Sequence, residues 1–246
     1  MKQRLFSLAV SCLALLAVVP GCKSPQQLAF ESVTGKTHSA VTPANRDNNR
    51  HKAFNARVKQ GNVDLIFIGD SITQGWEGKG KDVWAKYYGN RNAVNLGIGG
   101  DRTQHVLWRL DNGNIDGISP KVAVVMIGTN NSPPGNKQEE IADGIIAICK
   151  KLRTKLPNTK ILLLGIFPRD EKPTERRALL ARASRMASAV ADGKTIFYLD
   201  IGKKFLQADG TISKEIMPDY LHLSPAGYEI WAKAIEPKLA KLMSEK

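Results

Sequence analysis

Five continuous apolar runs recur along this chain, and longer stretches with helix-like spacing separate them. The runs are rich in β-branched and aliphatic residues and lie at 63–69, 93–98, 121–128, 160–167 and 195–201. A strand that is apolar on both faces must be covered on both faces, which is typical of a parallel sheet. Connections long enough to hold a helix favour the same arrangement. The sequence therefore predicts an α/β fold in which helices cover both faces of a five-stranded parallel sheet.

Polar loops that contain glycine follow the first three runs. They are Gly69-Asp70-Ser71, the segment 97–101 and the segment 128–131. Ligand sites of open α/β sheets lie beyond the carboxyl ends of the strands, so we expect these loops to converge. A nucleotide site is not indicated, because Arg102 stands where "GIGGDR" would need its third glycine and no P-loop string occurs.

Ser71 is either the cap of a following helix or a nucleophile, and a nucleophile needs a base. Among the four histidines, His222 lies in the polar loop "PDYLHLSPAG", three residues after Asp219. In a turn, this spacing lets the carboxylate reach the ring Nδ1–H and leaves Nε2 to take a proton from serine. Taken alone, the pair could equally be a turn aspartate and a surface histidine.

Acyl transfer also needs hydrogen-bond donors aimed at an oxyanion. Gly100 has no side chain, so a carbonyl group can approach its backbone N–H closely. Asn130 offers side-chain N–H donors, and the amide of Ser71 would add a third at a helix N-terminus. Each residue separately is also compatible with an ordinary turn. Only the combination of these loops with the histidine loop favours nucleophilic catalysis.

The remaining histidines and the cysteine of the folded part are expected to be bystanders. We expect His38 and His51 to be solvated, His105 to pack on a helix, and Cys149 to be a buried thiol on an apolar helix face.

Four blocks of the sequence resemble, in order, those of the SGNH (GDSL-type) serine hydrolases. The blocks are "GDSIT" (69–73), "NLGIGGDRT" (95–103), "GTNN" (128–131) and "DYLHLS" (219–224). The likeness is greatest to the catalytic subunits of platelet-activating factor acetylhydrolase. The resemblance implies a flavodoxin-like, three-layer α/β/α fold and no metal or organic cofactor.

The same resemblance assigns roles to residues. It implies that Ser71 is the nucleophile, His222 the general base and Asp219 the residue that orients His222. It implies an oxyanion hole formed by Ser71, Gly100 and Asn130. It also implies an acyl pocket lined by Ile72, Thr129 and Leu221.

We expect hydrolysis of small acyl esters, acetyl esters above all, through an acyl-Ser71 intermediate. The substrate suggested by the charge and the expected location is an O-acetylated carbohydrate. A lysophospholipase or thioesterase acting on longer acyl chains is an alternative that would use the same residues. A non-catalytic carbohydrate-binding module and a nucleotide-binding flavodoxin-like protein are alternatives of other classes.

The N-terminal residues predict export. Lys2 and Arg4 precede an apolar stretch that is shorter than the ~20 residues of a bilayer span, so residues 1–21 are expected to be a signal peptide. The string "VPGC" resembles a bacterial lipoprotein site, with Cys22 as the lipidated residue. Residues 22–45 are expected to be a flexible tether and residues 46–246 the hydrolase domain. The predicted location is a membrane facing the periplasm or the cell exterior.

The net charge of +13 does not by itself indicate a nucleic-acid partner, because the basic residues are scattered and no aromatic-interleaved basic stripe occurs. The expected partners are an ester substrate, a membrane reached through the lipid anchor, and a second copy of the chain in a homodimer.

Overall fold

The computed structural model describes residues 23–133 and 135–244, so the predicted signal peptide and Cys22 lie outside the described residues. Five strands form one sheet in the order β2-β1-β3-β4-β5, and all neighbouring pairs are parallel. The strands are β1 (Leu65–Gly69), β2 (Ala93–Gly97), β3 (Val122–Met126), β4 (Lys160–Leu164) and β5 (Ile196–Leu199). Each lies within one of the five predicted apolar runs, so the predicted sheet is confirmed.

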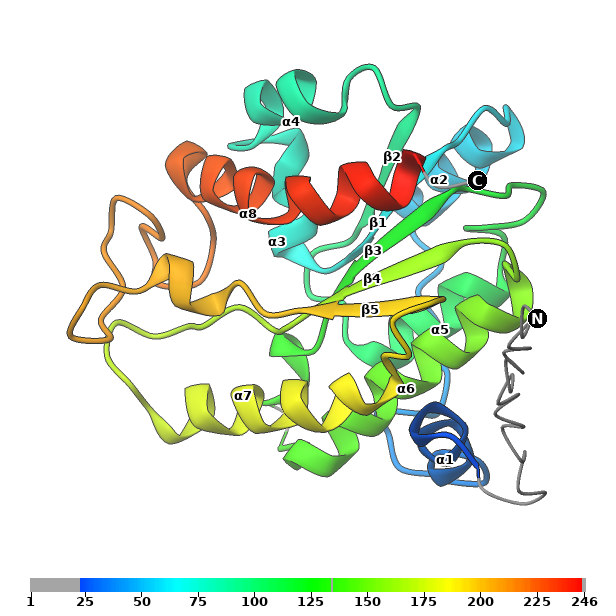
Figure 1. Cartoon of the computed structure of the whole chain (residues 1–246), viewed down its shortest axis with the longest axis horizontal. Coiled ribbons are helices and arrows are strands. Elements are labelled where there is room, and N and C mark those ends of the chain that lie inside the picture. Colours follow the sequence, from blue (N-terminus) through cyan, green and yellow to red (C-terminus); the bar gives the residue numbers. More distant parts are fainter. Residues whose placement is uncertain (1–22, 134, 245–246) are drawn as a thin grey trace, which may run out of the picture.

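Helices cover both faces of this sheet (Figure 1). The helices are α1 (Pro25–Ser32), α2 (Asn49–Lys59), α3 (Ser71–Gln74), α4 (Lys81–Tyr88), α5 (Thr103–Asp111), α6 (Gln138–Lys155), α7 (Glu175–Ala187) and α8 (Pro225–Ser244). Apolar side chains of α1, α2, α5, α6 and α7 pack on one face, and those of α4 and α8 pack on the other. This is the predicted three-layer α/β/α architecture. No helix in the described part of the chain has both the length and the apolar character that a bilayer span requires.

Alternate residues of each strand enter the two cores, as the pleat of a strand requires. Ile66 and Ile68 of β1 pack under α5 and α6, whereas Leu65 and Phe67 pack under α4 and α8. The second core is built around Trp76, which has no exposed surface and lies close to the rings of five other aromatic residues, namely Phe67, Trp84, Tyr88, Tyr228 and Trp231. Because Trp76 follows Ser71 by five residues, this core anchors the serine turn.

The segment before the domain differs from the predicted flexible tether. Within residues 23–45, α1 begins with a capping box formed by Ser24 and Gln27, and Ala29 is buried in the core. Further along the segment, the carbonyl of Ala40 accepts a hydrogen bond of 2.7 Å from Thr103 Oγ1. The tether prediction is therefore wrong for these residues, because apolar and hydrogen-bonding groups far along the chain hold them in place.

Candidate active site

The serine turn forms where β1 ends. Gly69 is required there, because a Cβ at this position would lie 2.5 Å from the carbonyl oxygen of Met126 and closer still to Thr73. Asp70 then caps α3 by accepting a hydrogen bond of 3.0 Å from the Ile72 N–H. Ser71 is the first residue of α3, where the helix offers no carbonyl to its N–H. The strand and the cap thus present the Ser71 hydroxyl at the carboxyl edge of the sheet.

The structure brings the three predicted catalytic residues together. His222 Nε2 lies 2.8 Å from Ser71 Oγ, and His222 Nδ1 lies 2.6 Å from Asp219 Oδ2. The other carboxylate oxygen of Asp219 accepts the backbone N–H of His222 at 2.7 Å. With the Nδ1 proton on the Asp219 side, Nε2 is left as an acceptor for the serine hydroxyl. The arrangement can accept a proton from Ser71 and stabilise the resulting imidazolium.

The electrostatics of the histidine loop favour an ionised Asp219. Partial burial alone would raise the pKa of Asp219, but hydrogen bonds from the ring and backbone N–H of His222 outweigh it and lower the pKa. The lowered pKa keeps Asp219 in its carboxylate form at neutral pH.

Helix α8 fixes both halves of the site. Ser224 accepts the Gly227 N–H at 3.2 Å and so caps α8, whose first residue is Pro225. The hydroxyl of Tyr228, one turn further on, donates to the carbonyl of Ile72 at 2.7 Å. One rigid helix thus carries the histidine loop at its N-terminus and holds the serine helix in place.

The predicted oxyanion donors lie on neighbouring loops. Gly100 has a φ of 78°, and a Cβ built on the preceding Gly99 would lie 3.7 Å from Cβ of Ser71. The Gly99 N–H is occupied by Gln74 Oε1 at 2.7 Å. Asn130 donates one side-chain N–H to the carbonyl of Asp101 at 3.0 Å and has a second to offer. The loop after β2 therefore lies between the serine turn and Asn130.

The three predicted acyl-pocket residues differ in exposure. Ile72 and Thr129 are buried, and Leu221 is half-buried against the same core as Ile72. Thr129 Oγ1 accepts a hydrogen bond of 3.1 Å from Arg169, a residue that sequence reasoning missed. A cleft of about 490 Å³ opens beside Ser71 and is lined instead by Gln74, Gly75, Glu77, Gly78 and Gly99. The acyl-pocket assignment therefore stays a prediction.

Asp70 is a buried carboxyl group next to the nucleophile. Burial raises the pKa of Asp70 to about 7. The hydrogen bond from the Ile72 N–H lowers this pKa, and the nearby Asp101 carboxylate raises it. Its role in the structure is that of the cap of α3.

The other nucleophilic and basic side chains lie outside this site. Cys149 is fully buried, and burial raises the pKa of its thiol to about 12, so it is not a nucleophile at neutral pH. His105 lies in the first turn of α5 and accepts the Arg102 N–H at 3.1 Å.

His38 lies 3.0 Å from the Asp143 carboxylate, and His51 is buried, so the prediction that both are solvated is wrong. The buried ring nitrogens of His51 have polar partners inside the protein, Asn114 at 3.0 Å and Asn55 at 3.2 Å.

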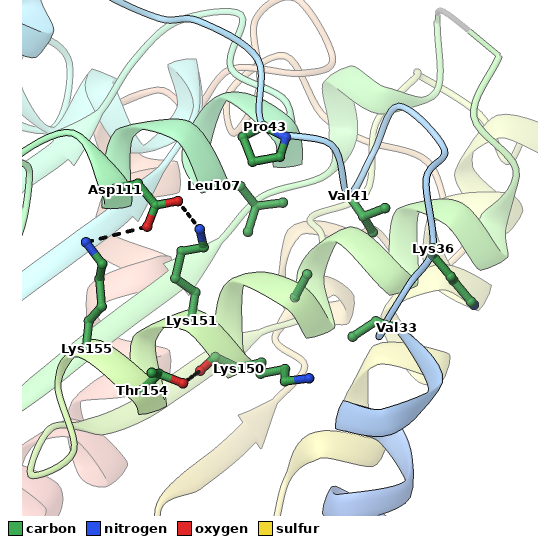
Figure 2. Close-up of a pocket in the computed structure, with 11 residues that line it drawn as sticks. Val33, Lys36, Val41, Pro43, Leu107, Asp111, Lys150, Lys151, Thr154 and Lys155 are labelled. Atoms are coloured by element: carbon green, nitrogen blue, oxygen red, sulfur yellow. Dashed lines mark hydrogen bonds and ion pairs between the residues drawn. The ribbon is translucent and has the colours of Figure 1, made fainter.

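A second cavity, of about 390 Å³, lies between residues 33–43 and helices α5 and α6 (Figure 2). Lys151 and Lys155, which line it, point toward Asp111, and both are ion-paired with it. These residues end α5 and α6 and so lie at the edge where strands begin, opposite Ser71. Among residues 23–133 and 135–244, no group of three His, Cys, Asp or Glu side chains is arranged to hold a metal ion.

Comparison with known proteins agrees with this geometry. The GDSL-like lipase/acylhydrolase family matches residues 67–230, which include the serine turn, both donor loops and the histidine loop. The chain belongs to this family. It is also 38% identical, over 197 residues, to the platelet-activating factor acetylhydrolase IB subunit alpha2 of Rattus norvegicus, covering 80% of this chain and 84% of the relative. The chain is therefore a hydrolase of carboxylic esters.

Solved structures share the fold of this hydrolase. The acetyl xylan esterase AlAXEase superposes with a TM-score of 0.61 at 22% identity, covering 72% of this chain and 100% of that one. A catalytic mutant of Axe2, an acetylxylan esterase from Geobacillus stearothermophilus, gives a TM-score of 0.57 at 17% identity, covering 76% of this chain and 96% of that one. At these identities the likeness establishes the fold alone.

Proposed function

We propose that this hydrolase removes acetyl and other short acyl groups from hydroxyl-rich alcohols, such as O-acetylated carbohydrates. The observation that carries the proposal is the continuous relay from Ser71 Oγ through His222 to Asp219, with contacts of 2.8 and 2.6 Å. A serine hydroxyl becomes a competent nucleophile when a base accepts its proton during attack.

In the proposed mechanism, Ser71 Oγ attacks the ester carbonyl carbon while His222 Nε2 takes the hydroxyl proton. The backbone N–H groups of Ser71 and Gly100 and the free side-chain N–H of Asn130 stabilise the oxyanion. The oxyanion collapses to acyl-Ser71, and His222 donates its proton to the leaving alcohol. Water then attacks the acyl carbonyl with His222 again as base, which releases the carboxylic acid and restores Ser71.

Two further observations support the substrate class. The cleft beside Ser71 includes the polar side chains of Gln74 and Glu77 among three glycines, which suits an alcohol with hydroxyl groups. Ile72 and Thr129 have branched side chains at the positions where the family resemblance places the acyl pocket, which would leave little room for a long acyl chain. The names of the relative and of the two esterases, which are all acetyl-ester hydrolases, point the same way.

The test compares acyl length and alcohol in one series. Wild-type protein is expected to hydrolyse p-nitrophenyl acetate far better than p-nitrophenyl decanoate and to release acetate from acetylated xylan. Ser71→Ala is expected to abolish both activities while keeping the wild-type circular dichroism spectrum. Preference for the decanoate would refute the short-acyl proposal, and full activity in Ser71→Ala would refute the nucleophile.

We also propose that the hydrolase is exported and anchored through a lipid on Cys22. The support is the sequence pattern of residues 1–22, in which an apolar segment leads to "VPGC". In a bacterial host, radiolabelled palmitate should enter the wild-type chain and fail to enter Cys22→Ser. Equal labelling of the two chains would refute the anchor.

A further inference from the structure

The oxyanion donor of Gly100 and the carbonyl of Gly99 belong to one peptide unit. Such a unit is planar, so the direction of the Gly99 C=O fixes the direction of the Gly100 N–H. Two adjacent glycines leave the torsion angles on either side of this plane unusually free. If the plane flipped, the Gly99 oxygen would face the developing oxyanion and repel it. The loop therefore needs a contact that holds the Gly99 oxygen away from the reaction.

Arg46 supplies that contact. Its Nη2 donates to the carbonyl oxygen of Gly99 at 2.5 Å, and its Nε donates to Asp101 Oδ1 at 2.7 Å. Gly100 lies between these two residues in the sequence, so one guanidinium group hydrogen-bonds to the residue on each side of the Gly100 N–H. A Cβ built on Gly100 would lie 3.7 Å from Arg46 Nη2, which places the charge beside the donor itself.

The second acceptor, Asp101, is itself held from inside the protein. Its side chain is fully buried, and its other oxygen accepts a hydrogen bond of 2.8 Å from Nε of the buried Arg109. Arg109 is fixed in turn by Asn114 Oδ1 at 2.6 Å. The carbonyl of Asp101 also receives the Asn130 side chain at 3.0 Å, so two of the proposed donors depend on this one residue.

We propose that Arg46 is a positioning residue that locks the Gly99–Gly100 peptide with its N–H directed at the oxyanion. This inference rests on the proposed acyl-Ser71 chemistry. In that chemistry, Arg46 contacts none of the reacting atoms. Arg46 also brings a positive charge close to the Gly100 N–H, which favours the oxyanion in the same direction.

The structure gives a reason to expect that the fold survives the loss of Arg46. Arg46 is 28% exposed, whereas Asp101 is fully buried and keeps the buried Arg109 as its counter-ion when Arg46 is removed. The matched control is Arg57 on α2, which donates to two loop carbonyls, those of Gly61 at 2.9 Å and Asn62 at 3.4 Å, neither of which belongs to the site.

The experiment measures kcat and KM for p-nitrophenyl acetate in wild type, Arg46→Ala, Arg46→Lys, Arg57→Ala and Ser71→Ala. Arg46→Ala is expected to lose roughly 10²-fold in kcat, the cost of one oxyanion donor, with KM changed by less than about 3-fold. The kcat of Arg46→Lys is expected to lie between those of wild type and Arg46→Ala, because one ammonium group cannot reproduce both hydrogen bonds of the guanidinium group. Millimolar guanidinium is expected to restore part of the activity of Arg46→Ala and to leave Arg57→Ala unchanged.

The outcomes separate this inference from the function on which it rests. If Ser71→Ala is inactive while Arg46→Ala keeps kcat within about 3-fold of wild type, the positioning role is refuted and the proposed function stands. If Ser71→Ala stays active, the proposed function itself fails. If Arg46→Ala does not fold, by thermal unfolding and circular dichroism, the test passes to Arg46→Lys, where an unchanged kcat overturns the inference and a selective loss of kcat supports it.

Discussion

Replacing Asp70 by asparagine tests the electrostatics next to the nucleophile. Asp70 is completely buried, and its Oδ1 caps α3 while its Oδ2 has no hydrogen-bond partner in the described part of the chain. Asparagine can keep the cap, because its side-chain oxygen accepts the same Ile72 N–H. The substitution therefore removes the ionisation and preserves the local geometry.

The magnitude follows from the change in pKa. Burial raises the pKa of Asp70 from its ordinary 3.8 to about 7, so the unfolded chain loses the proton at a lower pH than the folded protein does. Stability is therefore lost as the pH rises from about 4 to about 7, and it levels off above that range. This change in pKa lowers the free energy of unfolding by about 4 kcal/mol in total, and about 2.5 kcal/mol of that loss falls between pH 5 and pH 8.

The assay is urea unfolding of wild type and Asp70→Asn at pH 5, 6, 7 and 8. The free energy of unfolding of wild type is expected to fall relative to the variant by about 2.5 kcal/mol between the two extremes. Both proteins contain the same histidines, so the histidine contribution to the pH dependence cancels when the two free energies of unfolding are subtracted. Two parallel stability curves, or a wild type that gains stability relative to the variant as the pH rises, would refute the raised pKa.

Three more substitutions test other parts of the structure. Asp219→Ala should keep roughly 10²-fold more turnover of p-nitrophenyl acetate than His222→Ala, because the base remains and only its orientation is lost; equal rates would contradict these roles. Trp76→Ala should lower the free energy of urea unfolding by about 3–5 kcal/mol, because the indole is the centre of the aromatic core. A loss below about 1 kcal/mol would contradict this central position of Trp76. Thr103→Val should cost about 1–3 kcal/mol and expose residues 25–45 to protease, because the Ala40 carbonyl loses its donor; unchanged proteolysis would contradict the packing of that segment.

The parts of the fold that local patterns encode could be predicted from the sequence. The five strands follow from continuous apolar runs, and the start of α8 follows from Ser224 and Pro225. The positions of Ser71, His222 and Asp219 at one edge follow from the parallel sheet together with the short spacing of the last two.

The features that sequence reasoning missed depend on contacts between distant residues. Residues 23–45 look like a linker in composition, yet Lys36 pairs with Asp143, 107 positions away. His51 lies on a polar helix, but Asn114 holds its ring from 63 positions away. Arg46 carries no local signal, because its role appears only when Asp101 folds beside it. Only spatial proximity identifies such residues.

The most direct test of the central claim is peptide mass spectrometry after reaction with a fluorophosphonate. The account predicts a single phosphonyl adduct on Ser71 in the wild-type chain, formed much more slowly in His222→Ala and absent in Ser71→Ala. A wild-type chain that hydrolyses acetyl esters while Ser71 stays unmodified, or a His222→Ala chain labelled at the wild-type rate, would contradict it.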